Sequence, residues 1–291
     1  MKLRIYLFLM PIIFSNGYAQ KVYKRPKPKN SFAQGTLDFS FGYNNTSFSK
    51  STLKFKGNQY DFQLQSVAAV DRNEPYSLNY LAPSNFNEPQ FNVRFGYNFK
   101  NFWNISFGID NMKYRVLEGQ SARISGYIAP GVDPWWSGYF NDGQERVLQT
   151  NHFLYHNAGG INLLRLQVSR NLAPLKKFRD GAFAINWMYG IGASAVLSIT
   201  DFNFEGYRSE RVSSLSGYSI SAHTGLRFIF FKNFFLQSNF AGGLIHQVKV
   251  STRPNGGSSA FQVMAYGSVE GLFGVLVYLK PTNDCNSCPK W

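Results

Sequence analysis

The sequence predicts an all-β protein, a transmembrane antiparallel up-and-down β-barrel of about eight strands with a polar, side-chain-filled interior. Three observations predict this class. Apolar and polar residues alternate with a period of two along many segments, as in β-strands. Aromatic residues form 17% of the chain, yet its mean hydropathy is only −0.24. Membrane barrels combine these properties because only alternate residues face lipid. Finally, short and long connections between these segments alternate along the chain.

Residues 1–19 have the features of a secretory signal peptide. Lys2 and Arg4 precede an apolar run at 5–14, and Gly17 and Ala19 supply the small residues of a cleavage site. The apolar run is too short to span a bilayer. We therefore expect an exported protein from which this segment is removed.

A basic, proline-rich arm is predicted at 20–32. Its sequence KVYKRPKPK (21–29) suits neither a helix interior nor a strand interior. The chain carries a net charge of +14. Because the chain is exported, no nucleic-acid partner is expected, and outer-membrane lipid or lipopolysaccharide is the expected counter-charge.

Eight alternating segments are predicted as wall strands of a barrel domain at 33–280. The clearest is the hairpin 91–110, FNVRFGYNFKNFWNISFGID, in which aromatic and aliphatic residues occupy the odd positions. A further hairpin at 51–70, turning at Lys56, would give ten strands if it joined the wall. The predicted strands are 35–44, 90–99, 102–117, 160–171, 182–200, 220–230, 234–250 and 261–279.

The connections predict the topology. Short joins fall at 100–102, 173–181 and 231–233, and long ones at 45–89, 118–159, 201–219 and 251–260. The motif FKNF occurs at the first and last short joins, and strand parity predicts a three-residue loop at each. Outer-membrane barrels have short periplasmic turns and long outer loops, so both termini are expected in the periplasm.

In a membrane barrel the aromatic face meets lipid, and the polar face lines the interior. Eight strands leave an interior that side chains just fill, and a buried charge needs a partner. Arg94 is expected opposite Gly108 and diagonal to Asp110. The sequence thus predicts a plugged barrel with an interior ion network formed by Asp38, Arg94, Asp110, Arg165, His223, Arg227 and Glu270.

The export signal, the eight aromatic alternations and the balanced polar interior resemble the small OmpA/OmpX-type barrels of Gram-negative outer membranes over residues 33–280. This resemblance implies an outer-membrane location, but many functions share the architecture. We expect a structural or interaction role in the cell envelope, for example as an accessory subunit of an outer-membrane assembly or transport complex. A lipid A- or phospholipid-modifying enzyme and a narrow channel remain as alternatives.

The sequence offers no convincing catalytic or metal site. His246 is expected on the lipid-facing wall without a serine or carboxylate beside it. His152 and His156 lack the further ligands of a metal site, so no metal or cofactor is expected. A tail at 281–291 carries Cys285 and Cys288, which are read as a disulfide or an inert tail.

Loops carry function more often than walls do. The residues expected to contact a partner are therefore Trp135, Trp136, Tyr60 and Asp61, unless their loops pack together to cap the barrel.

Overall fold

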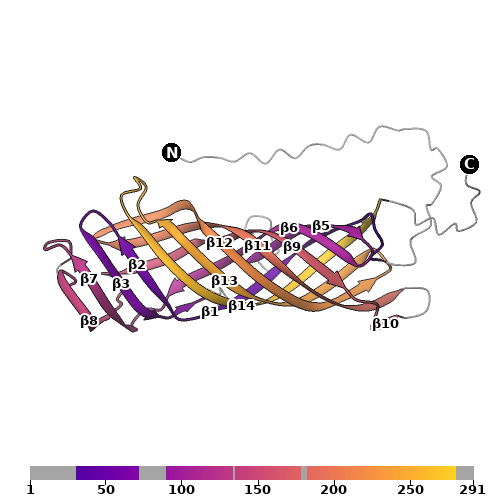
Figure 1. Ribbon diagram of the computed structural model, residues 1–291, viewed down its shortest axis with the longest axis horizontal. Coiled ribbons are helices and arrows are strands. Elements are labelled where there is room, and N and C mark those ends of the chain that lie inside the picture. The colour runs from indigo at the N-terminus through magenta and orange to yellow at the C-terminus, as the bar shows by residue number, and fades with distance from the viewer. Residues whose placement is uncertain (1–30, 72–89, 134, 178–181, 280–291) are drawn as a thin grey trace, which may run out of the picture.

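The computed structural model describes residues 31–71, 90–133, 135–177 and 182–279, and its regular elements are all β-strands (Figure 1). Within these residues there is no helix long and apolar enough to cross a membrane. The predicted signal peptide, most of the predicted basic arm and the cysteine-containing tail lie outside the described residues. The strands are β1 Thr36–Phe48, β2 Ser51–Lys56, β3 Tyr60–Val67, β4 Ala69–Val70, β5 Phe91–Lys100, β6 Trp103–Val116, β7 Ser121–Ile128, β8 Gly138–Val147, β9 Leu154–Asn171, β10 Lys176–Lys177, β11 Phe183–Phe204, β12 Tyr207–Phe230, β13 Phe234–Ser251 and β14 Ser259–Tyr278.

Eight of these strands form a closed antiparallel ring. They follow one another in the order β1, β5, β6, β9, β11, β12, β13 and β14, and β14 pairs with β1 to close the ring. The prediction of an eight-stranded up-and-down barrel is confirmed. The short turns lie at one end, which we call the turn end, and the opposite end is called the loop end.

The register of the ring fixes its tilt. A path of paired residues that starts at Leu37 on β1 passes through Tyr97, Ile105, Val168, Ile191, Ala222, Gly242 and Gly267 and returns to β1 at Ser47. One circuit therefore climbs ten residues along β1 (47 − 37 = 10). Eight strands with this stagger are tilted by about 40° to the barrel axis.

The strands continue beyond the ring at the loop end, where they form an extension with its own sheet. β2 follows β1 in the chain and pairs with the part of β14 that lies nearer the loop end. β3 pairs with β2, β7 with β3 and β8 with β7, which completes the sheet of the extension. Figure 1 shows these four strands together at one end of the long barrel. The hairpin predicted at 51–70 thus forms as β2 and β3, but it builds the extension and does not widen the ring.

Two predicted long loops are wrong. The segment 118–159 contains β7 and β8, and 201–219 is mostly strand, because β11 and β12 meet in a tight turn. Glu205 and Gly206 at this turn both have positive φ, 63° and 64°, as a type I′ hairpin requires. Most of these residues lie beyond the aromatic wall of the ring, so they lack the alternation that marks it.

One of the two FKNF turns has the predicted form. Phe230 pairs with Phe234, which leaves the three-residue loop 231–233. At the other turn Lys100 pairs with Trp103, so the loop holds two residues, and a register shift lies between Tyr97 and Lys100. The additional residue that keeps the apolar faces of the two strands on the same side is therefore found in β5, as a β-bulge, and not in the loop.

The interior has three layers along the barrel. A small apolar cluster of Phe32, Ile229, Phe235 and Leu276 occupies the turn end. Polar and charged side chains fill the middle, and a large aromatic and aliphatic core fills the loop end and the extension. The sequence predicted the polar layer, whereas the apolar core above it is a finding of the structure.

Candidate functional site: the filled interior and the extension

The charged residues of the middle layer form one connected network. Arg94 Nη2 lies 3.0 Å from Asp110 Oδ1 and 3.0 Å from Glu270 Oε1. Arg165 Nε lies 2.9 Å from Asp110 Oδ2. All four side chains are buried, and Arg94 pairs with Gly108 across the hairpin as predicted. Because two arginines share two carboxylates in a closed space, no charge of this group is left uncompensated.

Neutral amides join this group to a second ion pair near the turn end. Glu270 accepts a hydrogen bond from Asn239 at 3.0 Å, and the amide of Gln237 donates to Asn239 at 3.0 Å. Arg227 Nε donates to Gln237 at 2.6 Å, and Arg227 Nη2 lies 3.8 Å from Asp38. Sequence reasoning missed both amides, although both face inward by the same strand parity as the charged residues.

The turn end of the barrel is closed by the apolar cluster. The Arg227 guanidinium lies 4.2 Å from the ring centroid of Phe235 and 5.8 Å from that of Phe32. Phe32 precedes β1 and is 1% exposed. The aromatic rings thus cover the last cation of the network, a favourable arrangement for a guanidinium out of water.

His223 belongs to the interior but not to the ion pairs. Its imidazole nitrogens lie 3.0 Å from the Ser169 hydroxyl and 3.4 Å from the Gln167 amide nitrogen. The ring is buried among neutral polar groups. Of the seven residues predicted for the network, six form ion pairs, in two groups joined by neutral amides, and His223 lies beside them.

The core at the loop end is built mainly from aromatic rings. Phe55 of β2 stacks on Phe62 and Phe202 with centroids 5.3 and 5.2 Å away, and it meets Phe153 and Tyr155 edge-on. All five side chains are at most 3% exposed. The extension is therefore a packed body fixed to the ring, since β2 and β14 hydrogen-bond directly.

The four residues predicted to contact a partner have different environments. Trp135 is 69% exposed, whereas Trp136 is 3% exposed and stacks on Phe153 in the core. Tyr60 is also buried, and its hydroxyl lies 2.5 Å from that of Ser258. Asp61 is exposed and pairs loosely with Lys54 at 3.9 Å. Trp136 and Tyr60 thus stabilise the extension, and Trp135 and Asp61 face solvent.

A hollow of about 450 Å³ lies beside this tryptophan pair. His152 lines it, with Nδ1 3.6 Å from Asp133 and its ring 5.6 Å from that of Trp135. The residues lining the hollow are Trp135, Trp136, Arg146, Val147, Gln149 and His152. An exposed indole and an arginine beside one hollow are groups that commonly anchor protein contacts.

A second hollow, of about 470 Å³, lies between the turn that follows β2 and the turns that precede β12 and β14. Arg253 forms its floor: it donates to the carbonyls of Phe204 and Tyr207 at 2.8 and 3.0 Å and lies 3.3 Å from Glu205. Burial raises the pKa of Tyr60, which also borders this hollow. Arg253 therefore joins the turns of the extension. Sequence analysis did not single it out.

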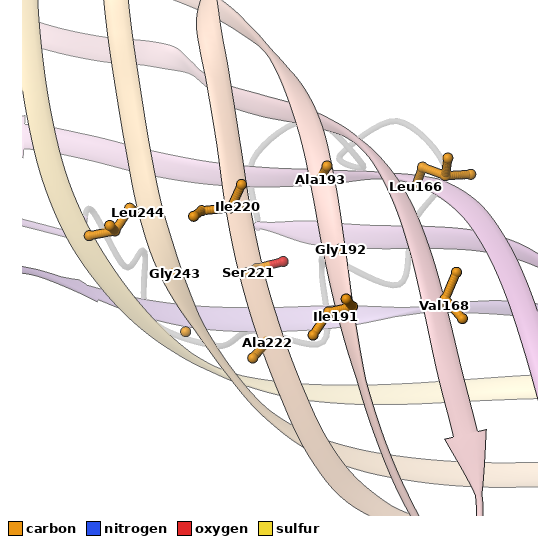
Figure 2. Close-up of a pocket in the computed structure, with 11 residues that line it drawn as sticks. Leu166, Val168, Ile191, Gly192, Ala193, Ile220, Ser221, Ala222, Gly243 and Leu244 are labelled. Atoms are coloured by element: carbon orange, nitrogen blue, oxygen red, sulfur yellow. The ribbon is translucent and has the colours of Figure 1, made fainter.

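The outer wall carries a third hollow, of about 700 Å³, on β9, β11, β12 and β13 (Figure 2). Small residues form its floor, among them Ala193, Ala222 and Gly242, and larger aliphatic side chains surround it. Above it, His246 Nδ1 lies 2.9 Å from the Tyr218 hydroxyl. His246 is thus on the wall, as expected, and its hydrogen-bonding neighbour is a tyrosine.

Among the described residues no group of three or more histidines, cysteines, aspartates or glutamates could hold a metal ion. His152 faces Asp133, whereas His156 is buried on β9 opposite Arg115 and Asp201. The two histidines of the TNHFLYH segment therefore face different surroundings.

No family model and no curated protein matches the chain. A search of solved structures finds similarity to several outer-membrane proteins. OprG from Pseudomonas aeruginosa is 11% identical, with a TM-score of 0.43 over 84% of this chain and 97% of that one. Neisserial surface protein A is 11% identical, with a TM-score of 0.36 over 84% and 98%. The attachment invasion locus protein of Yersinia pestis, bound to a heparin analogue, is 13% identical, with a TM-score of 0.33 over 84% and 99%.

The chain's own structure defines its class. A closed eight-stranded ring has apolar side chains on its outer face and a hydrogen-bonded polar interior. This arrangement is that of a transmembrane β-barrel of the outer membrane. Its architecture is that of the small OmpA/OmpX-type barrels, with an added extension at the loop end.

Proposed function

We propose that the protein has a non-conducting, interaction role in the cell envelope, in which the barrel anchors the extension at the cell surface. The filled interior is the observation that carries this proposal. An apolar cluster, an ion network and an aromatic core follow one another along the axis. A barrel filled in this way leaves its outer wall and its ends as the surfaces that can act.

The proposed orientation follows from connection length. Three short connections lie at the turn end, together with both ends of the described barrel at Thr36 and Tyr278. Outer-membrane barrels place their short turns in the periplasm. The extension then faces outward, and the basic arm at 20–32 and the tail at 281–291 lie in the periplasm.

The hollow beside Trp135 is the proposed contact for a partner. Trp135 and Tyr139 are 69% and 80% exposed, although large aromatic side chains are usually buried. The rings of Tyr127 and Tyr139 lie 4.4 Å apart on the neighbouring strands β7 and β8. Trp135, in the connection between β7 and β8, and Tyr139 and Arg146 on β8 are of the residue types that dominate binding energy in protein interfaces. An accessory subunit of an envelope complex would use such a surface.

Photo-crosslinking tests this proposal. Trp135 is replaced by the photoreactive residue benzoylphenylalanine in living cells, and the same replacement at Phe95, which is 60% exposed on the ring wall, is the control. We expect a discrete protein adduct from position 135 that position 95 does not give. If neither position, or both positions equally, gave the adduct, the surface would have no specific partner.

Planar bilayer recordings separate this role from that of a channel. The purified protein is expected to give no discrete conductance steps, because the ion network occupies the ring. Regular steps from the unmodified protein would contradict the non-conducting role. Steps from a variant with Arg94→Ser and Asp110→Ser, but not from the unmodified protein, would identify this pair as part of the obstruction.

A further inference from the structure

The lipid-facing wall of the ring has two very different heights. On β1 the outward apolar residues run from Leu37 to Tyr43 and are followed by Asn45 and Ser47. On β14 they run from Val277 up to Phe261. At about 2.5 Å of axial rise per residue in tilted strands, these runs span about 15 and about 40 Å.

The wall is tall on β11 to β14 and short on β1, β5, β6 and β9. The register shows the change directly, because Asn45 and Ser47 of β1 pair with Val269 and Gly267 of β14. Outward apolar residues on β14 continue for several more positions above that level. We call these two halves the tall wall and the short wall.

The tall wall exceeds the height that lipid can cover. The apolar band of an outer-membrane barrel is about 25 Å tall, so the upper part of the tall wall lies above the hydrocarbon. Its large exposed side chains, here called the upper patch, are 40–69% exposed. The members of the upper patch are Leu215, Tyr218, Leu244, Val248, Phe261 and Val263.

The inner face of the same strand segments is buried in the protein, with apolar side chains interspersed with the uncharged polar residues Gln247 and Gln262. Ile245, Val250, Ala260 and Met264 alternate with the upper patch and are at most 2% exposed in the loop-end core. An antiparallel sheet that meets water normally has one polar face. A sheet segment that is buried on its inner face and still carries large exposed apolar side chains on its outer face above the bilayer indicates that the outer face is covered by protein.

We infer that the tall wall is the interface through which two copies of this chain form a dimer in the outer membrane. A covering partner must have an apolar wall that rises equally far above the hydrocarbon. A second copy inserted in the same direction meets this requirement. A two-fold axis along the membrane normal places residues at the same height on the two copies opposite each other, so the two tall walls rise equally far.

The relief of the tall wall is self-complementary. Outward small residues at Ala193, Ala222 and Gly242 form the hollow in Figure 2, and Phe240 protrudes beside it with 64% exposure. By the register, Phe240 and Ala222 lie within about 2 Å of the same height. A two-fold rotation therefore brings the partner's Phe240 to the hollow, and the reverse contact forms at the same time.

The apolar area that the tall wall presents is comparable with the area that a standard interface buries. The upper patch with Ile191, Ile220, Phe240 and Val269 makes ten side chains that are 40–69% exposed. At roughly 80–100 Å² each, they present on the order of 900 Å² per copy, against about 800 Å² per partner in a standard interface. The polar His246–Tyr218 pair inside this area is already hydrogen-bonded.

Cysteine cross-linking in outer-membrane vesicles tests the dimer. Leu244→Cys places a thiol in the upper patch, and Ser47→Cys places one on the short wall at about the same height, both in a C285S, C288S background. We expect a disulfide-linked band of twice the chain mass from position 244, at least tenfold stronger than from position 47. Equal bands would indicate random collision and would overturn the inference.

Filling the hollow provides the second measurement. Ala222→Trp is expected to abolish the position-244 cross-link, whereas Ile105→Trp on the short wall leaves it unchanged. Folding of each variant is checked by its migration before and after boiling, and only folded variants are compared. Native mass spectrometry that showed a monomer with bound lipopolysaccharide would also overturn the inference that a second copy covers the tall wall. A cross-link from position 244 to a different protein would overturn it as well.

Discussion

Arg165 Nη2 donates a hydrogen bond of 2.8 Å to the hydroxyl of Tyr266, and through this contact the ion network meets the aromatic core. The other side of Arg165 faces Asp110, and the ring of Tyr266 packs in the apolar core. A tyrosine suits such a boundary because it has an apolar body and a polar tip. Tyr266 therefore links the ion network of the ring to the apolar core at the loop end.

Removing this hydroxyl should weaken the whole molecule. Tyr266→Phe leaves a buried guanidinium with one fewer acceptor, so the free energy of unfolding should fall by about 2 kcal/mol. Urea unfolding in detergent micelles, followed by tryptophan fluorescence, measures this change. Tyr139→Phe removes a hydroxyl from a side chain that is 80% exposed and should change stability by less than about 0.5 kcal/mol. Equal losses in the two variants would contradict the assigned role of Tyr266.

Breaking the ion network should cost more than removing it. Asp110→Asn takes one carboxylate from two buried arginines, and the expected loss is about 3–5 kcal/mol. Replacing Arg94 and Asp110 together by Met and Leu should cost less than the sum of the two single replacements, because the residues are coupled. The same unfolding experiment gives all the values, and strict additivity would show that the residues do not act as a pair.

The extension should unfold separately from the ring when its core is disrupted. Phe55→Ala removes a ring that touches four other aromatic side chains, and such truncations cost about 3–5 kcal/mol. Limited proteolysis should then cleave within β2, β3, β7 and β8, while the ring keeps the heat-sensitive migration of a folded barrel. Phe95→Ala, at an exposed wall position, should leave proteolysis unchanged.

Buried tyrosines should make the extension sensitive to alkali. Burial raises the pKa of Tyr114 to about 12 and raises that of Tyr60 as well. The folded state favours the neutral phenols. Their contribution to stability is therefore complete below pH 10, the ordinary pKa of tyrosine, and is lost as pH rises through about 12. Absorbance at 295 nm should show delayed ionisation of the buried tyrosines followed by opening of the core.

A variant separates this effect from general alkaline damage. Tyr114→Phe removes one titrating group, although it also loses the 2.6 Å hydrogen bond from Gln262. Its stability at neutral pH should be slightly lower, and its decline between pH 10 and 12 should be shallower. An identical decline in both proteins would assign the transition to other groups.

The ring and its interior network could be predicted from sequence because lipid imposes a strict contrast on alternate residues. Arg94 and Asp110 stand on the polar face of an aromatic hairpin, and the short turn fixes their register. Parity alone therefore places them inside. The amides Gln237 and Asn239 obey the same rule, but neutral polar residues are too common inside barrels to indicate that two ion pairs are linked through them.

The extension could not be predicted in the same way because no lipid faces its strands. β8 has the sequence GYFNDGQERV, and the upper half of β12 is rich in serine and arginine. Without a lipid-facing side the period-two contrast disappears, and such segments look like loops. The burial of Trp136 beside the exposed Trp135 depends on which side of one turn packs on the core, and adjacent identical residues carry no signal for that choice.

The continuity of β1 with β2 along β14 has a mechanical consequence. A pull on the extension is transmitted to the ring along hydrogen bonds that lie across the direction of the strands, so many bonds share the load at once. No flexible hinge separates the β2 ladder from the ring. A partner bound at Trp135 would therefore be held at a fixed distance and angle from the membrane. Movement of the membrane would be transmitted to that partner almost directly.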